Sequence, residues 1–89
     1  MTGETRALLE FPCDFPIKMM GRDNDDFHAA ARMIVEQHAG PVDDNAVRTA
    51  PSRNGRFISI TITIEARSQA QLDAIYLDLS AHDDVLIAL

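Results

Sequence analysis

The segment "RFISITITIEA", residues 56–66, constrains the fold more than any other part of the chain. From Ile58 to Ile64 every second residue is isoleucine, and the three residues between them carry hydroxyl groups. Because successive side chains of a β-strand point to opposite faces, this alternation predicts a strand with one apolar face and one face of small hydroxyls. The apolar face must lie against a core, whereas the role of the hydroxyl face is the question that the pattern raises.

Two other segments have the spacing of amphipathic helices. The first follows Asp23 or Asn24, either of which can cap its free N–H groups, and it ends at Gly40. The second is predicted over residues 69–81, with Ser68 as the start of a capping box. Each helix carries a single apolar stripe, so each is expected to bury only one of its faces.

Three further segments predict strands, at residues 15–21, 45–50 and 85–89. Pro51 cannot donate a ladder hydrogen bond, which suits an edge position for the strand at 45–50. The Asn54-Gly55 pair is typical of tight hairpins and predicts that this strand pairs with 56–66.

The last of these strands, "VLIAL", is expected to alternate between the core and the outside. Val85, Ile87 and Leu89 would face the core, which leaves Leu86 and Ala88 pointing outward on an edge strand. An exposed apolar edge favours pairing with another chain unless something covers it.

The order strand, helix, strand, strand, helix, strand predicts an α+β fold. Right-handed crossovers place both helices on one face of a four-stranded antiparallel sheet, which is the split βαβ or ferredoxin-like arrangement. The first and third strands are then central, and the second and fourth are edges. We expect one domain over residues 8–89 and a disordered N-terminus over residues 1–7.

Composition argues against several classes of partner and location. The net charge is −6, with 8 Lys and Arg against 14 Asp and Glu, which disfavours nucleic acids and anionic membrane surfaces. The single Cys13 excludes an intramolecular disulfide and fits the cytoplasm. No signal peptide is evident at the N-terminus, and no apolar stretch approaches the roughly 20 residues that span a bilayer.

The residue types that carry chemistry are present but not in productive patterns. His28 and His38 are too far apart on one helix to share a metal ion, and no CxxC or HxxxH spacing occurs. The hydroxyls of the central strand lack a neighbouring base, and the glycines form no phosphate-binding loop. We therefore predict a protein that is not an enzyme, with no catalytic residues, no metal site and no cofactor.

Candidate binding residues lie in three places. At the start of the first helix, Gly21, Arg22 and Asn24 surround free N–H groups that could receive the carboxylate of a small metabolite such as an amino acid. On the open face of the sheet, the candidates are Lys18, Phe57, Ser59 and Thr61. Leu86 is the candidate at the edge.

Nucleic-acid binding through Lys18, Arg48, Arg53, Arg56 and Phe57 is the alternative. RNA-recognition domains of this topology stack bases on sheet aromatics, and here the central strand offers one aromatic residue in an acidic chain. The composition therefore favours a protein or metabolite partner over RNA.

Three segments, "LLEFPCDFPIKMMG", "PSRNGRFISITITIEA" and "IYLDL...VLIAL", together resemble the YbeD-like family of small bacterial proteins of unknown function. The resemblance covers nearly the whole chain from Leu8 to Leu89, although the family typically has tyrosine in place of Phe57. It implies a ferredoxin-like fold similar to ACT domains, which bind amino acids and form dimers, and a regulatory link to lipoate metabolism. The family carries no established catalytic or binding residues.

The residues and the resemblance together lead to one leading hypothesis. The chain is expected to be a non-catalytic cytoplasmic module that regulates by binding a protein partner or a small metabolite, with a homodimer as one form of assembly. An RNA-binding ferredoxin-like domain is the alternative.

Overall fold

The structure is a computed structural model that describes residues 9–89. The expected boundary between a disordered segment 1–7 and a domain that starts at residue 8 lies outside these residues. The chain forms, in order, β1 (Cys13–Arg22), α1 (Asp25–Ala39), a 3-10 turn (Asp44–Ala46), β2 (Val47–Pro51), β3 (Phe57–Ala66), α2 (Gln69–Ala81) and β4 (Ile87–Ala88).

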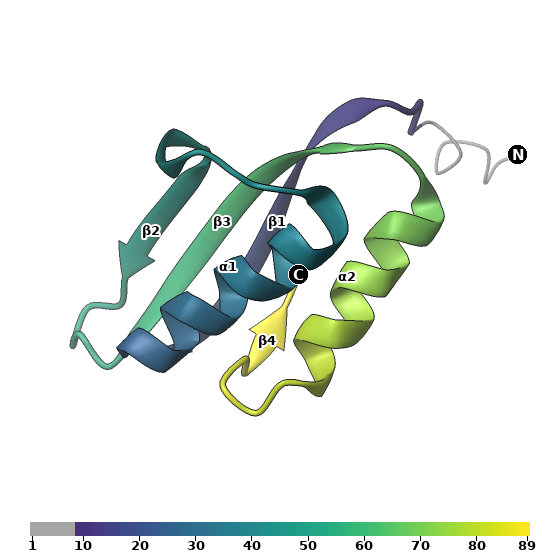
Figure 1. Cartoon of the computed structure of the whole chain (residues 1–89). Coiled ribbons are helices and arrows are strands. Elements are labelled where there is room, and N and C mark those ends of the chain that lie inside the picture. The colour runs from purple at the N-terminus through teal and green to yellow at the C-terminus, as the bar shows by residue number, and fades with distance from the viewer. Residues whose placement is uncertain (1–8) are drawn as a thin grey trace, which may run out of the picture.

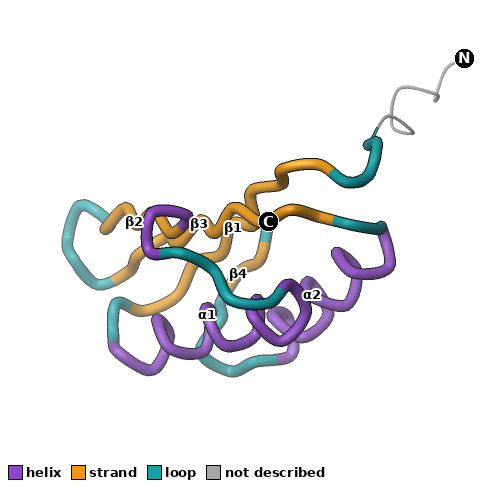
Figure 2. The backbone as a smooth tube through the Cα atoms, turned by 45° about the horizontal axis from the view of Figure 1, so that its top comes forward, coloured by secondary structure: helices purple, strands orange, loops and turns teal. Residues whose placement is uncertain are grey.

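The four strands form one antiparallel sheet with the order β2-β3-β1-β4, and both helices cover the same face of it (Figures 1 and 2). The central strands are therefore the first and third of the chain, as predicted. This order and the two-layer arrangement confirm the ferredoxin-like α+β fold. Within residues 9–89 no helix lies on the opposite face of the sheet, and we call it the open face.

The predicted alternation of β3 accounts for the core. All four isoleucines from Ile58 to Ile64 are buried, with at most 5% of their surface exposed. They meet Ile17 and Met19 of β1, which is paired with β3 along ten residues. The apolar stripes of α1 and α2 pack on this face of the sheet, and each helix contributes several fully buried side chains, such as Phe27 and Val35 of α1 and Ile75 and Leu79 of α2.

Both helix starts have the caps that were expected. The Asn24 side chain accepts a hydrogen bond from the N–H of Phe27 at 2.8 Å, which selects Asn24 rather than Asp23 as the cap of α1. The Ser68 hydroxyl accepts from the N–H of Gln71 at 3.0 Å at the start of α2.

The β2–β3 hairpin differs from the two-residue turn that Asn54-Gly55 suggests. The strands are joined by a five-residue loop from Ser52 to Arg56, and Gly55 adopts a φ of 75°. The Asn54 side chain accepts the N–H of Arg56 at 3.1 Å, so asparagine shapes the loop through its side chain. The second strand starts at Val47 rather than at residue 45, because the residues before it form the 3-10 turn.

The predicted facing of the last strand is wrong. Val85 is buried, but Ile87 and Leu89 are 49% and 64% exposed, and Ala88 is the residue that packs against the core. The N–H groups of Leu86 and Leu89 donate to the carbonyls of Met20 and Lys18 at 2.9 and 2.7 Å. The step from Leu86 to Leu89 is three residues, whereas the step from Met20 to Lys18 on β1 is two. The last strand therefore contains one extra residue, as in a β-bulge, and the residues after it point to the face opposite to the predicted one.

Candidate partner-binding surface

The open face is built from residues that alternate with the core residues on the same strands. The register of the strands aligns these residues in rows across the sheet, so it identifies the neighbour of each residue on the next strand. One row contains Arg48 of β2, Thr61 of β3 and Lys18 of β1. The next contains Ala50, Ser59, Met20 and Ile87, and a third contains Phe57 and Arg22. The candidates Lys18, Arg22, Phe57, Ser59 and Thr61 therefore lie together on this face.

An apolar cluster occupies the β4 side of the open face. Met20 and Ile87 are paired across β1 and β4, and Leu89 follows Ile87 on the same face, beside Lys18. Their exposed fractions are 36%, 49% and 64%. The tyrosine hydroxyl of Tyr76 on α2 donates a hydrogen bond to the carbonyl of Leu89 and ties the end of β4 to the helix layer. Ile87 and Leu89 were expected in the core, so the sequence pattern did not predict their place in this cluster.

Leu86 is also exposed, at 54%, as predicted for an outward residue of the edge. Its N–H donates to the carbonyl of Met20, so its backbone joins the sheet just before β4. Leu86 precedes the two paired residues of β4, Ile87 and Ala88, and lies beside rather than within the rows of the open face.

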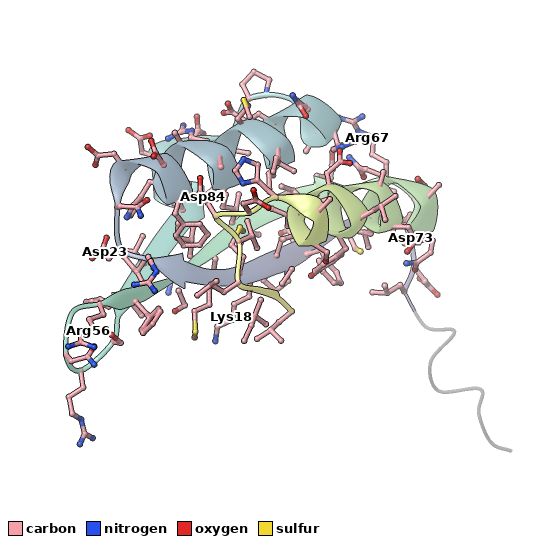
Figure 3. All side chains as sticks on the ribbon, turned by 90° about the horizontal axis from the view of Figure 1, so that it is seen from below. Lys18, Asp23, Arg56, Arg67, Asp73 and Asp84 are labelled. Atoms are coloured by element: carbon pink, nitrogen blue, oxygen red, sulfur yellow. The ribbon has the colours of Figure 1, made fainter. Side chains whose placement is uncertain are left out.

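Basic side chains gather on the open face and at the hairpin beside it. Lys18 projects away from both helices, and Arg56 lies on the hairpin between β2 and β3 (Figure 3). With Arg22, Arg48 and Arg53, these five exposed residues include every described Lys and Arg except Arg32 and Arg67. We call them the basic cluster. None of the five forms an ion pair with another residue of 9–89.

One member of the basic cluster contacts an aromatic ring. The guanidinium carbon of Arg22 lies 5.7 Å from the centroid of the Phe57 ring, within the range of a cation–π interaction. Phe57 is half-buried, so the arginine covers part of the aromatic surface that a nucleic-acid base would need.

The acidic residues have a different distribution. Asp14 and Glu65 occupy opposite positions at the far end of the open face, beyond the row of Lys18. Most other carboxylates lie on the helices and their loops, where some hold basic groups in place. Glu36 and Asp44, for example, accept hydrogen bonds from Arg32 at 3.3 and 2.7 Å. The molecule thus combines a negative net charge with one positive region.

The predicted ligand site before α1 is exposed at Arg22 and Asn24 but not at Gly21. Gly21, a predicted ligand contact, is buried, and a Cβ atom at this position would lie 2.5 Å from the carbonyl oxygen of Asp84 and 2.8 Å from the Phe27 ring. The glycine therefore serves close packing and offers no surface to a ligand. Asn24 uses its side chain as the helix cap, and Asp23 contacts the ring of His28 at 3.0 Å.

A hollow of about 260 Å³ lies elsewhere, between the end of α1, the 3-10 turn and the last part of β3. Its lining includes Pro41, Val42, Glu65 and Arg67, none of which was predicted as a site residue. Among residues 9–89, no three His, Cys, Asp or Glu side chains come close enough together to hold a metal ion. His38 and His82 instead lie near single carboxylates, those of Asp78 and Asp84.

The described part of the chain contains no helix with the length and hydropathy needed to cross a membrane. Its fold and surface define a small α+β domain with an open sheet face. The chain belongs to the family described as "Protein of unknown function (DUF493)", whose model matches residues 6–89. This is the family of small bacterial UPF0250 proteins, and the resemblance to YbeD-like proteins is thereby confirmed.

Two relatives illustrate the match. A UPF0250 protein of Paraburkholderia phytofirmans is 40% identical over 89 residues, which is 100% of both chains. A UPF0250 protein of Nitrosomonas europaea is 43% identical over 83 residues, covering 93% of this chain and 95% of the relative.

The solution structure of protein HP0495 from H. pylori has a similar fold. Its TM-score is 0.75 at 17% sequence identity, and the match covers 100% of this chain and 94% of that one. The shared architecture supports the fold and carries no information on function.

Proposed function

We propose that this chain is a non-catalytic regulatory module that binds a protein partner on the open face of its sheet, in the cytoplasm. The observation that carries the proposal is the exposed cluster of Met20, Ile87 and Leu89. These side chains lie side by side on a face that neither helix covers. Grouped exposed apolar residues are typical of interaction sites, whereas single ones are common on any surface.

The small side chains beside the apolar cluster also support a protein partner. Ser59 and Thr61 of the central strand present hydroxyl groups next to this cluster. Small polar groups allow close packing against another protein, and their hydroxyls can donate or accept hydrogen bonds there. The regulatory role and the link to lipoate metabolism rest on the resemblance alone. A homodimer as the assembly rests on the resemblance and on the exposed apolar residues of the last strand.

A pull-down from the native cell extract with quantitative mass spectrometry tests the proposal. The double variant Met20→Ser, Ile87→Ser is expected to lose the specific partner. Leu77→Ser is the matched control, because Leu77 is a large exposed residue on α2, away from the open face. Equal recovery of the same proteins with the double variant and the wild type would show that the open face is not the binding surface.

RNA binding is the second candidate function, and the basic cluster around Phe57 is the observation that favours it. Five cations beside one aromatic ring on an open sheet can contact phosphates and one base. A gel-shift experiment at low salt with single-stranded RNA tests this candidate, and the absence of a shifted band would exclude it.

A further inference from the structure

We infer that the partner of the open face is an acidic segment of another protein that also carries apolar side chains. The inference rests on the proposed function and specifies the chemistry of the partner. It combines two features that lie side by side on the face, the basic cluster and the apolar cluster of Met20, Ile87 and Leu89.

The first argument is the grouping of cations on one face of an acidic chain. The chain has an excess of acidic residues, yet Lys18, Arg22 and Arg48 are exposed without an ion pair to any residue of 9–89. Arg32, on the helix side, shows the opposite arrangement, since Glu36 and Asp44 both accept its hydrogen bonds. Cations grouped on one face create a positive local potential, and acidic side chains of a partner would be attracted to it.

The second argument is the spacing of the cations. Arg48 and Lys18 lie in one row on either side of Thr61. Because neighbouring strands are about 4.8 Å apart, the two Cα atoms are roughly 10 Å apart. Two carboxylates two residues apart on an extended segment point to the same side and are about 7 Å apart, so the long side chains of Arg48 and Lys18 can reach both. The Thr61 hydroxyl between the two cations can add a hydrogen bond to either carboxylate.

The third argument is that the surroundings favour protein over nucleic acid. Leu89 adjoins Lys18, and Met20 follows two residues later on β1, so apolar and basic groups alternate over a short distance. Apolar side chains of a protein segment can use that surface, whereas a phosphate backbone cannot. Asp14 and Glu65 at the end of the same face would repel a polyanion that extends along the sheet.

The experiment is an NMR titration of the ¹⁵N-labelled full chain at low salt with three probes. The first probe is a capped peptide with glutamates and leucines at every second position and serine between them, so that both types point to one side when the peptide is extended. The second probe has glutamine in place of each glutamate. The third is a single-stranded RNA of similar length. Lys18→Glu tests the basic cluster, and Lys18→Gln tests it without a new negative charge. Arg67→Glu is the control, because it makes the same change of charge at an exposed position outside the cluster.

The glutamate peptide is expected to shift the amide signals of Lys18, Thr61 and their row. Its affinity should exceed that of the glutamine peptide by at least about fivefold, and Lys18→Glu should remove most of this difference while Arg67→Glu should not. Equal affinity of the two peptides for this face would overturn the acidic partner and leave the proposed function intact. Tighter binding of RNA with the same dependence on Lys18 would identify a nucleic-acid partner instead. No shifts on this face with any probe would contradict both proposals.

Discussion

Asp14 on β1 and Glu65 on β3 occupy directly opposite positions in the sheet, and both side chains are exposed on the open face. Like charges at opposite positions of an antiparallel pair destabilise the sheet. Glu65→Lys should therefore raise the free energy of unfolding by about 0.2–1 kcal/mol, as measured by urea denaturation. Asp83→Lys makes the same change of charge in the loop before β4. If Asp83→Lys raises the free energy of unfolding by the same amount, the effect comes from the net charge and not from the repulsion between Asp14 and Glu65.

Gly21 should tolerate no side chain. A Cβ atom would meet the backbone carbonyl of Asp84 and the buried ring of Phe27, and neither can move without disturbing β4 or α1. Gly21→Ala is expected to lower the free energy of unfolding by about 1–3 kcal/mol in urea denaturation. Met20→Ala, at the neighbouring exposed position, should cost much less. A Gly21→Ala protein as stable as the wild type would contradict the packing described for this loop.

Tyr76 should hold the end of β4. Its hydroxyl donates to the carbonyl of Leu89, so Tyr76→Phe is expected to speed amide hydrogen exchange at Leu86 and Leu89, whose N–H groups pair with β1. Exchange in the central strands should stay unchanged. Unaltered exchange at both amides would show that the hydroxyl contributes nothing to the edge.

Tyr76 should also make the stability of the protein depend on pH in the alkaline range. Partial burial raises the pKa of its hydroxyl above the usual value of 10.0. A group with a raised pKa in the folded state stabilises the fold below its unfolded pKa, and this contribution is lost as the pH rises above about 10. Urea midpoints measured on both sides of pH 10 should fall more in the wild type than in Tyr76→Phe. Equal falls would contradict the expected contribution.

Glu36 should stabilise the connection between α1 and β2. The N–H of Val42 donates to its carboxylate at 2.9 Å, and this bond, helped by Arg32, holds the pKa of Glu36 below its usual value of 4.5. The contribution is present above that value and is lost as the pH falls through and below it. Glu36→Ala should lower the urea midpoint at neutral pH and have a smaller effect in acid. Gln37→Ala, at the next and exposed position, is the control and should change little at either pH.

Much of the fold could be predicted because the local patterns agree with the tertiary structure. The isoleucines of β3 are spaced for one face of a strand, and Ser68 marks the start of α2 by its side-chain hydrogen bond. Both signals act over a few residues. The order of the elements then leaves few ways to cover the apolar face of the sheet.

The candidate binding surface was only partly predictable. Lys18, Phe57 and Thr61 were assigned to the open face by the alternation of β1 and β3. The burial of Gly21 could not be predicted, because it depends on the close approach of Asp84, more than sixty positions away. Lys18, Arg48, Arg53 and Arg56 were grouped as candidates from the sequence, whereas the contact of Arg22 with Phe57 came only from the structure.

The sequence by itself determined the order and type of the strands and helices, and which face of β3 is buried, because alternation and capping are properties of neighbouring residues. Only the tertiary structure decided that Ile87 and Leu89 lie on the open face. The hydrogen bonds to Met20 and Lys18 place three residues of the last strand against two of β1. That single extra residue turns Ile87 and Leu89 to the open face. Register of this kind depends on contacts between distant segments, which a local pattern does not contain.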